Sequence, residues 1–321
     1  MLRAITLIAA AAIAAAVLPP PQASARDLLK VATGQRGNWN AAIGELGQRA
    51  GIFKKHDLVL EILYTSGSGE TQQAVISGAV DVGTAVGTMG AMSAFTKGAP
   101  IRVIGAETTG GADYWYVPAM SPIKTMKDTD GKTIAFSTNG ASTHSVVLAF
   151  IKELGLKAKA VATGNPAATM TQVMTGQVDV GWGSPPFGVK ELDEGRIRIV
   201  ARATDLAMVR GQTIRVLATN ADALGKRKDA LVRFMDAYRE SLDYMYSDDP
   251  KVIKDYAEFA GISPEVARRT RDIFPKELLQ PDEIKGLDLM MSEAINLKFT
   301  PAPLSNEQLK ELIQIPPRNR S

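Results

Sequence analysis

The sequence predicts an α/β protein built from two similar lobes and followed by a helical tail. Strand-like and helix-like segments alternate from residue 28 to residue 201, a pattern typical of sheets covered by helices. One phrase occurs twice, as SGAVDVGTA at 77–85 and as TGQVDVGWG at 175–183. Its two aspartates lie about 100 residues apart, which is the length of a small domain. Beyond residue 226 the apolar positions follow helical spacing.

The first 25 residues are typical of a secretory signal peptide. Arg3 supplies a positive charge, an apolar run follows at 4–18, prolines break it at 19–21, and Ala23-Ser24-Ala25 matches a cleavage site. A membrane anchor is the alternative, but the run is shorter than the roughly 18 apolar residues that a spanning helix needs. We therefore expect cleavage after Ala25 and export by the general secretory route, since the segment has no twin-arginine pair.

The overall composition argues against several classes of binding partner and of site chemistry. Of the 321 residues, 45% are hydrophobic and 22% are charged, and 37 basic against 34 acidic residues give a net charge of +3. This balance argues against a nucleic acid or an acidic membrane surface as the partner. The chain has no cysteine, which excludes disulfides, cysteine–metal sites, thiol catalysis and the lipid-bearing cysteine of a lipoprotein. We expect a monomeric protein of the bacterial periplasm that needs no cofactor and no metal.

The first lobe is predicted from successive units of strand, helix and glycine. Each predicted helix ends at a glycine, which adopts the left-handed conformation at little cost. We expect strands at 28–32, 58–63, 80–82 and 101–106, and helices at 41–50, 70–77 and 89–96.

The second lobe follows the same order, with a polar turn at 137–141 after its first strand. We expect strands at 133–136, 178–180 and 197–201, and helices at 142–154, 168–175 and 187–194. A strand at 214–218 then leads into the tail. Helices of the tail are predicted to begin at the N-caps Asp249, Ser263 and Ser305, the first two of which precede a proline.

Asp81 and Asp179, the acids of the repeated phrase, are predicted to be structural. Each lies between two valines in a strand that is too short to be stable outside a sheet. A carboxylate in such a place usually accepts hydrogen bonds from a neighbouring segment. We therefore expect similar surroundings for the two aspartates and no catalytic role.

Several short strings, taken in order, resemble one protein family. GIFKK and LVLE within 51–61, SGSG at 66–69, KGAP at 97–100, DGK at 130–132 and His144 near Ser142 are similar to the nitrate/sulfonate/taurine family of ABC-transporter substrate-binding proteins. The resemblance covers residues 37–242. It implies a type II periplasmic binding fold with hinge crossovers near 114–117 and 214–218. Lobe one would comprise 26–116 and 216–321, and lobe two would comprise 117–215.

Such proteins bind a solute between their lobes, so the resemblance places the ligand at turns beyond the strands. The turns at 66–69 and 137–140 each bring hydroxyl or amide side chains to a helix start, where backbone N–H groups attract anions. Simple N-capping is the alternative, but capping needs only one such residue. We predict ligand contacts from Ser66, Ser68, Asn139, Ser142 and Thr143.

Aromatic and neighbouring side chains complete the predicted site. Trp39 and Trp182 follow strands in glycine-rich or polar turns, where an indole can form a flat apolar wall for a ligand. Trp115 is expected in the core. The remaining predicted contacts are Asn38, Thr88, Tyr114, His144 and Pro185.

The chain departs from the family pattern at two points. Relatives often have Gly-Ser-Ser ahead of the histidine, where this chain has Ala141 in place of one serine. Relatives often have Trp-Glu-Pro after the second repeat, where this chain has Trp182-Gly183-Ser184-Pro185. One hydroxyl and one charge are therefore missing, which favours a less charged pocket for a larger or aromatic organic anion.

An enzyme on the same fold is the alternative to a binding protein. A sulfinate-cleaving hydrolase and the thiamine-pyrimidine synthases resemble the same family, and both use a cysteine that this chain lacks. Ser142 and His144 lie on one helical turn and are not spaced as a catalytic pair. We therefore predict no catalytic residues. We expect a periplasmic protein that captures a sulfonate, a carboxylate or a related organic solute and delivers it to an inner-membrane ABC permease. A sensor partner without transport is a further alternative.

Overall fold

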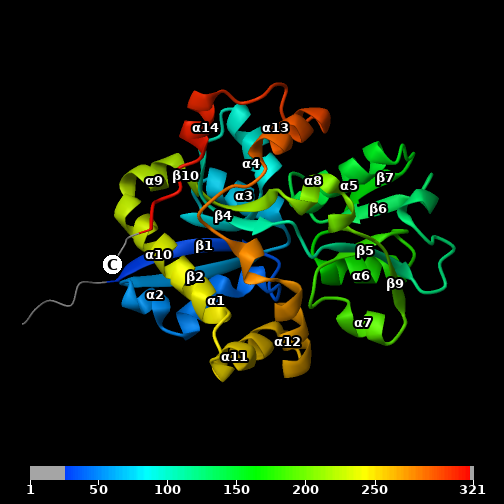
Figure 1. Ribbon diagram of the computed structural model, residues 1–321, viewed down its shortest axis with the longest axis horizontal. Helices are drawn as coiled ribbons and strands as arrows, with labels where there is room; N and C mark the ends of the chain where they lie inside the picture. Colours follow the sequence, from blue (N-terminus) through cyan, green and yellow to red (C-terminus); the bar gives the residue numbers. More distant parts are fainter. Residues whose placement is uncertain (1–25, 319–321) are drawn as a thin grey trace, which may run out of the picture.

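The computed structural model describes residues 26–318, and the predicted signal peptide lies outside this range. Two lobes lie side by side, and the chain crosses between them twice (Figure 1). Lobe one comes from the first and last parts of the described chain, whereas lobe two comes from its middle. The predicted α/β fold with two lobes and a helical tail is therefore confirmed.

A five-stranded mixed sheet forms the centre of lobe one. The first three strands of the chain are parallel, while β10 runs antiparallel between β3 and β4. Since β10 follows lobe two in the sequence, the returning chain completes the sheet. In sheet order the strands are β2 (Leu58–Thr65), β1 (Asp27–Gly34), β3 (Val82–Gly87), β10 (Thr213–Asn220) and β4 (Ile101–Thr109).

Lobe two repeats this arrangement with shorter strands. One pair is parallel, a second group is antiparallel, and a parallel bridge between Ile134 and Val180 joins them. The resulting order β7-β6-β8-β5-β9 matches β2-β1-β3-β10-β4 strand for strand. The strands of lobe two are β5 (Tyr114–Pro118), β6 (Thr133–Phe136), β7 (Lys159–Ala162), β8 (Gly181–Gly183) and β9 (Ile197–Arg202).

Sheet membership places the crossings slightly outside the predicted hinge segments. The sequence predicts crossovers near 114–117 and 214–218, but β5 pairs only with strands of lobe two and β10 only with strands of lobe one. We therefore propose that the chain crosses at 110–113 and again between β9 and β10. The predicted strands at 80–82 and 178–180 also begin later, since the aspartates precede β3 and β8.

Helices cover both faces of the lobe-one sheet. Neighbouring side chains of β10 point to opposite faces: Leu217 faces the apolar cluster of α1 and α10, whereas Val216 and Ala218 face the cluster of α3 and α4. The helices before the tail are α1 (Ile43–Arg49), α2 (Ile52–Lys55), α3 (Ser68–Ile76), α4 (Thr88–Thr96), α5 (Ser142–Glu153), α6 (Pro166–Met174), α7 (Val189–Asp193) and α8 (Ala207–Arg210). Short 3₁₀ turns lie at Asn40–Ala42, Met126–Asp128 and Ala203–Asp205.

The tail begins its helices at the predicted caps. Asp249 accepts a hydrogen bond from Lys251 N at 2.9 Å, and Ser305 with Gln308 forms the predicted capping box. Ser263 likewise accepts from a backbone N–H. The tail consists of α9 (Ala221–Lys226), α10 (Lys228–Met245), α11 (Pro250–Ala260), α12 (Pro264–Ile273), α13 (Leu287–Asn296) and α14 (Asn306–Leu312), with a 3₁₀ turn at Lys276–Leu279.

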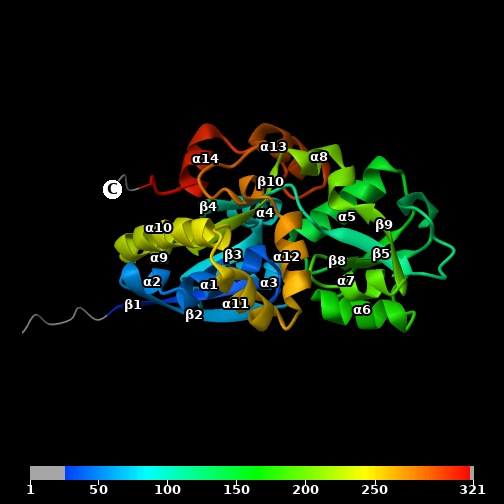
Figure 2. The same ribbon diagram turned by 60° about the horizontal axis from the view of Figure 1, so that its bottom comes forward.

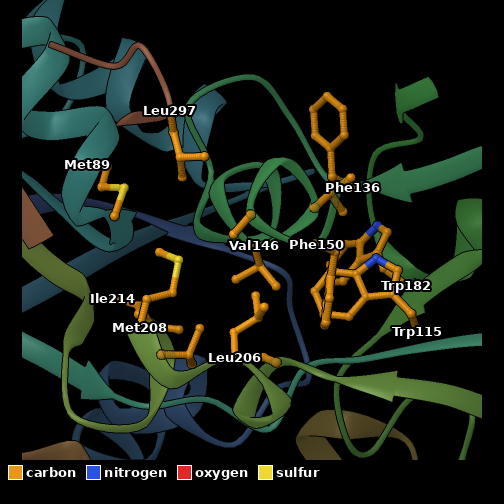
Figure 3. Close-up of a cluster of buried hydrophobic side chains, with 14 of the residues drawn as sticks. Met89, Trp115, Phe136, Val146, Phe150, Trp182, Leu206, Met208, Ile214 and Leu297 are labelled. Carbon is orange, nitrogen blue, oxygen red and sulfur yellow. The ribbon is translucent and has the colours of Figure 1, made fainter. Parts of the chain in front are cut away.

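The tail contacts both lobes. Figure 2 shows α12 and α13 beside the junction of the lobes. Arg269 in α12 pairs with Asp193 in α7 at 2.9 Å, and Lys152 Nζ in α5 donates to the carbonyl of Asn296 at 3.2 Å. An apolar cluster also runs across the junction, from Met89 in α4 to side chains of α5 (Figure 3). The junction is therefore packed as well as hydrogen-bonded.

The two aspartates of the repeated phrase make the same contact in each lobe. Asp81 Oδ2 accepts from Lys30 N in β1 at 2.8 Å, and Asp179 Oδ2 accepts from Thr133 N in β6 at 2.9 Å. Partial burial raises the pKa of Asp179, but the hydrogen bonds from Thr133 and the charge of Lys132 outweigh it and lower that pKa. Both carboxylates therefore bind the equivalent neighbouring strand, which explains the repeat and agrees with the structural prediction.

Replacing Asp179 by alanine is expected to lower the free energy of unfolding by about 1–3 kcal/mol, because charged hydrogen bonds to a partly buried strand are lost. Asp81→Ala should have a similar effect in lobe one. Urea denaturation measures both, with the exposed Asp248→Ala as the matched control. A loss for Asp179→Ala no larger than that for Asp248→Ala would contradict the structural role.

Candidate functional site

The junction of the lobes lies at the carboxyl ends of β1, β2 and β3 in lobe one and of β6 and β8 in lobe two. Two helix starts meet there, because α3 begins at Ser68 and α5 begins at Ser142. The backbone N–H of Gly69 donates to Thr138 Oγ1 at 2.9 Å, a direct hydrogen bond between the lobes. Ligands of α/β sheets bind beyond the carboxyl ends of strands, so this junction is the candidate site.

Glycines make the close approach of the lobes possible. A Cβ atom on Gly69 would collide with the backbone carbonyl of Asn139, and one on Gly90 would collide with that of Gly140. A Cβ atom on Gly87 would lie 2.6 Å from the same Gly140 oxygen. Because all of these neighbours are backbone atoms, no side chain can move aside. The lobes are therefore in direct backbone contact at these glycines.

Ser68 is the predicted site residue whose surroundings best fit a ligand contact. Its side chain is buried at the start of α3, and its hydroxyl has no hydrogen-bond partner among the described residues. Buried polar groups in folded proteins are nearly always hydrogen-bonded, so an unpartnered hydroxyl at a helix start points to a ligand or water. Ser66 lies half-buried beside it, and its backbone N–H donates to Glu70 Oε2 at 2.9 Å.

The predicted hydroxyls of lobe two differ in their surroundings. Ser142 is buried at the start of α5. Thr143 Oγ1 accepts from the backbone N–H of Ser137 at 3.0 Å and lies 2.9 Å from its hydroxyl, so Thr143 stabilises the turn. The side chain of Asn139 is exposed. The ligand contacts predicted for these residues stay predictions.

His144 is also held by its own lobe. Its ring stacks on Phe136 with centroids 4.3 Å apart, and Gly140 N donates to its Nδ1 at 3.4 Å. Phe299 of the tail packs edge-on against it, with centroids 5.8 Å apart. Burial lowers the pKa of His144, so the ring is held in its neutral form.

The predicted aromatic wall is corrected for Trp39, which lies in the core of lobe one, whereas Trp182 is buried in lobe two among the residues that line a small pocket, so its ligand contact stays a prediction. Trp39 is fully buried, donates its Nε1–H to Tyr246 at 2.9 Å and packs edge-on against Tyr256. Trp182 lies directly opposite Trp115 in the pairing of β8 with β5, so both indoles point to the same covered face (Figure 3). The sequence analysis placed both tryptophans in turns. In the structure a 3₁₀ turn begins directly after Trp39, and Trp182 lies inside β8.

Asn38 and Thr88 lie buried in lobe one near the junction. The Asn38 amide donates to Gln35 Oε1 at 2.9 Å, while its own oxygen has no partner among the described residues. The hydroxyl of Thr88, at the start of α4, donates to the carbonyl of Thr213 at 2.6 Å. Asn38 therefore keeps a free acceptor, whereas the Thr88 hydroxyl already donates to β10.

Tyr114 and Pro185 lie in lobe two. The Tyr114 hydroxyl donates to the carbonyl of Phe187. Pro185 is buried and follows Ser184, a fully buried residue whose hydroxyl has no partner in the described part of the chain. Ser184 was not among the predicted contacts.

Glu107 is a buried carboxylate that the sequence analysis missed. It is fully buried, accepts from Asn40 Nδ2 at 2.7 Å and accepts from the backbone N–H of Ala85, whose φ is 56°. Burial raises the pKa of Glu107 to about 7, although Asn40, the charge of Arg215 and the Ala85 N–H act in the opposite direction. The sequence feature that could have revealed Glu107 is the presence of an acid inside the otherwise uncharged string VIGAETT at 103–109.

A buried ion pair lies beside the junction end of the lobe-one sheet. Arg215 Nη2 lies 2.5 Å from Asp113 Oδ2, and in β10 Arg215 stands opposite Gly87. Arg215 Nη1 and Asp113 Oδ1 have no hydrogen-bond partner among residues 26–318. The pair therefore retains one donor and one acceptor near the contact between the lobes. No group of three His, Asp or Glu residues in this range could hold a metal ion.

Comparison with known proteins gives one family match. Residues 40–251 match the family model described as NMT1/THI5 like. No curated protein matches the sequence. None of the described helices is long and apolar enough to cross a membrane.

Solved structures similar to this chain share its fold at low sequence identity. The alkanesulfonate-binding protein SsuA from Xanthomonas axonopodis pv. citri, bound to MOPS, has a TM-score of 0.75 at 18% identity, covering 91% of this chain and 100% of that chain. The periplasmic nitrate-binding protein NrtA from Synechocystis PCC 6803 has a TM-score of 0.72 at 13% identity, covering 90% of this chain and 86% of that chain. The desulfurization enzyme DSZB has a TM-score of 0.61 at 15% identity, covering 88% of this chain and 96% of that chain.

Proposed function

Because the chain belongs to the NMT1/THI5-like family, we propose that it is the solute-binding component of an ABC importer in the periplasm. One observation carries the proposal: two helix starts from different lobes meet at the junction, and the buried Ser68 hydroxyl there has no hydrogen-bond partner among residues 26–318. The predicted signal peptide supports the location. An inner-membrane permease is the proposed partner, and it would recognise the form with its lobes in contact.

The proposed solute is a small organic anion, such as a sulfonate or a carboxylate. Backbone N–H groups at helix starts favour negative charge, and Ser68 adds a hydroxyl donor. Arg215 supplies a guanidinium near the same junction, and its Nη1 has no hydrogen-bond partner in the described part of the chain. Two similar structures are of proteins named for binding an alkanesulfonate and nitrate, both of which are anions.

Binding would act by shifting an equilibrium between open and closed forms. The glycines at 69, 87 and 90 touch lobe two only when the lobes are in contact. A solute that contacts both lobes binds the closed form more tightly and so increases its population. The permease would then receive the closed, loaded protein.

An enzyme is the second candidate, because DSZB shares the fold. The sequence favours binding, since the chain has no cysteine and only two histidines. One of these, His144, is held against Phe136, and the other, His56, pairs with Glu240 on lobe one. Neither histidine is bonded to a serine hydroxyl in the described structure, as nucleophilic catalysis would require.

Small-angle scattering of refolded, ligand-stripped protein tests the proposal. Methanesulfonate, benzoate, nitrate and a pyrimidine serve as probes, and we expect at least one organic anion to reduce the radius of gyration and raise the melting temperature. Ser68→Ala should weaken binding of that probe about tenfold through loss of one hydrogen bond to an anion. Ser77→Ala, on an exposed helix end, is the control. If no probe changes either quantity, the binding function is wrong.

A further inference from the structure

A small pocket lies in lobe two between β5, α6 and α7. Its volume is about 240 Å³, and its walls include the side chains of Tyr114, Tyr116, Met170 and Phe187, with Glu191 at one side. The ring centroids of the two tyrosines are 6.1 Å apart. The predicted site residues Tyr114 and Trp182 are among the residues that line this pocket, whereas the predicted helix-start contacts are not.

Alternation along β5 explains the pocket. Tyr114 and Tyr116 point to the face opposite Trp115, because successive side chains of a strand alternate. They lie over Gly183 and Gly181 of β8, and a Cβ atom on Gly181 would lie 2.5 Å from Tyr116 Cζ. The Gly-Trp-Gly string therefore buries its indole on one face and leaves room for two tyrosines on the other.

The hydroxyls of the two tyrosines differ. Tyr114 donates to the Phe187 carbonyl, whereas the Tyr116 hydroxyl has no hydrogen-bond partner among the described residues. Tyr116 is only 1% exposed. A buried tyrosine hydroxyl usually finds a partner, so a wall residue with an unpartnered donor indicates an acceptor on a bound molecule.

The size of the pocket suits an occupant of one ring. A cavity of about 150 Å³ is enough to bind benzene, whereas pockets for drug-sized ligands begin at about 300 Å³. The observed volume lies between these values. A single substituted ring therefore fits in the pocket.

The residues that line the pocket favour a neutral occupant over an anion, because none of them is a lysine or an arginine. Glu191 is the one charged residue in its wall, and this carboxylate pairs with Arg196 at 2.9 Å. Burial raises the pKa of Tyr116, and the charges of Tyr114 and Glu191 add to that effect. The surroundings therefore favour neutral groups over negative ones.

We propose that this pocket binds an uncharged single ring that carries a hydrogen-bond acceptor for the Tyr116 hydroxyl. The pocket adjoins the junction, because a Cβ atom on Gly37 of lobe one would lie 3.2 Å from the Phe187 ring. Its role rests on the proposed function: it selects solutes that have a neutral ring at one end, in addition to the anionic group held at the helix starts.

Ligand-observed NMR and calorimetry with three one-ring probes test this site directly. Benzamide is neutral and has an acceptor, benzoate is charged, and toluene has no acceptor. We expect benzamide to bind in this pocket at least about tenfold more tightly than either of the others. Tyr116→Phe should weaken benzamide binding about tenfold, the effect of one hydrogen bond, and leave toluene unchanged.

A second variant tests the pocket by filling it with a larger side chain. Ala167 is exposed in α6 at the edge of the pocket, so Ala167→Trp should block it and abolish benzamide binding without disturbing the core. Thr171→Trp, exposed on the next turn of α6 and outside the wall, is the matched control. Circular dichroism checks that each variant is folded.

The outcomes separate this inference from the proposed function. No benzamide binding, benzoate binding here as tightly as benzamide, or unchanged binding in Ala167→Trp would each overturn the pocket assignment. Scattering with the anionic probes reports the closing of the lobes and does not depend on Tyr116. Benzamide binding without closure by any solute would therefore support the pocket and refute the transport role.

Discussion

Replacing Gly90 by alanine is expected to weaken solute binding by at least about 100-fold, because the variant cannot reach the closed form. The added methyl group would collide with the backbone carbonyl of Gly140 in the other lobe. Apparent affinity falls in proportion to the population of the binding-competent form, so a closed form that is nearly inaccessible removes most of the affinity. Gly69→Ala should behave alike, since its methyl group meets the Asn139 carbonyl.

The folded lobes themselves should tolerate these changes. Gly90 lies in α4, where alanine is favoured over glycine, and the nearest lobe-one atom to the added methyl group is the end of the Gln72 side chain at 2.9 Å, which can move aside. The melting temperature of the unliganded protein should therefore change little. Gly225→Ala in α9 is the matched control, because a Cβ atom there meets no atom within 4 Å. Calorimetry gives the affinities, and scattering gives the closure. Wild-type affinity in Gly90→Ala would show that binding does not need the observed contact.

The second large effect concerns Glu107 and pH. Its pKa rises from the ordinary 4.5 in the unfolded chain to about 7 in the folded protein, with burial as the main cause. Between these values the folded state holds a proton that the unfolded state has lost, so stability falls as the pH rises. The stability that the protonated Glu107 contributes is fully present below pH 4.5 and is lost as the pH rises to 7 and above. Its size is about 3 kcal/mol.

Glu107→Gln removes the titrating group and keeps its shape. The glutamine oxygen can accept from Ala85 N. Its NH₂ group can donate to the Asn40 oxygen once the Asn40 amide, which presents its Nδ2 to Glu107, turns over. The difference in unfolding free energy, wild type minus variant, should therefore fall by about 3 kcal/mol between pH 4.5 and pH 7.5. Denaturation across that range measures it, with the exposed Glu153→Gln as control. A difference that does not depend on pH would show that Glu107 does not titrate there.

Local chemistry explains why much of the fold was predictable. The glycines at 51, 78, 98, 155 and 176 have positive φ, as predicted for residues that end helices. The caps at Asp249, Ser263 and Ser305 were likewise visible in the sequence. The repeated phrase predicted two equivalent lobes, and its aspartates make equivalent hydrogen bonds. Each of these features depends on residues close together in the chain or on direct repetition.

The features that the sequence did not predict depend on contacts between distant residues. Trp39 is buried by tyrosines more than 200 positions away, and nothing near it in the sequence indicates them. Glu107 and Arg215 come from strands that pair only after the chain has returned from lobe two. The Tyr116 pocket depends on the register of β5 with β8. Alternation of side chains could have placed both tyrosines on one face, but it could not supply their neighbours.

The order of the strands has a consequence for how the chain folds. The lobe-one sheet needs β10 between β3 and β4, and β10 ends at Asn220. The middle segment, by contrast, contains every strand of its own sheets. Emerging from a ribosome or a translocation pore, the second lobe can therefore form as an autonomous unit while β4 still lacks its neighbour. Maturation of the first lobe must wait for that late strand, which makes its assembly the slower, long-range step.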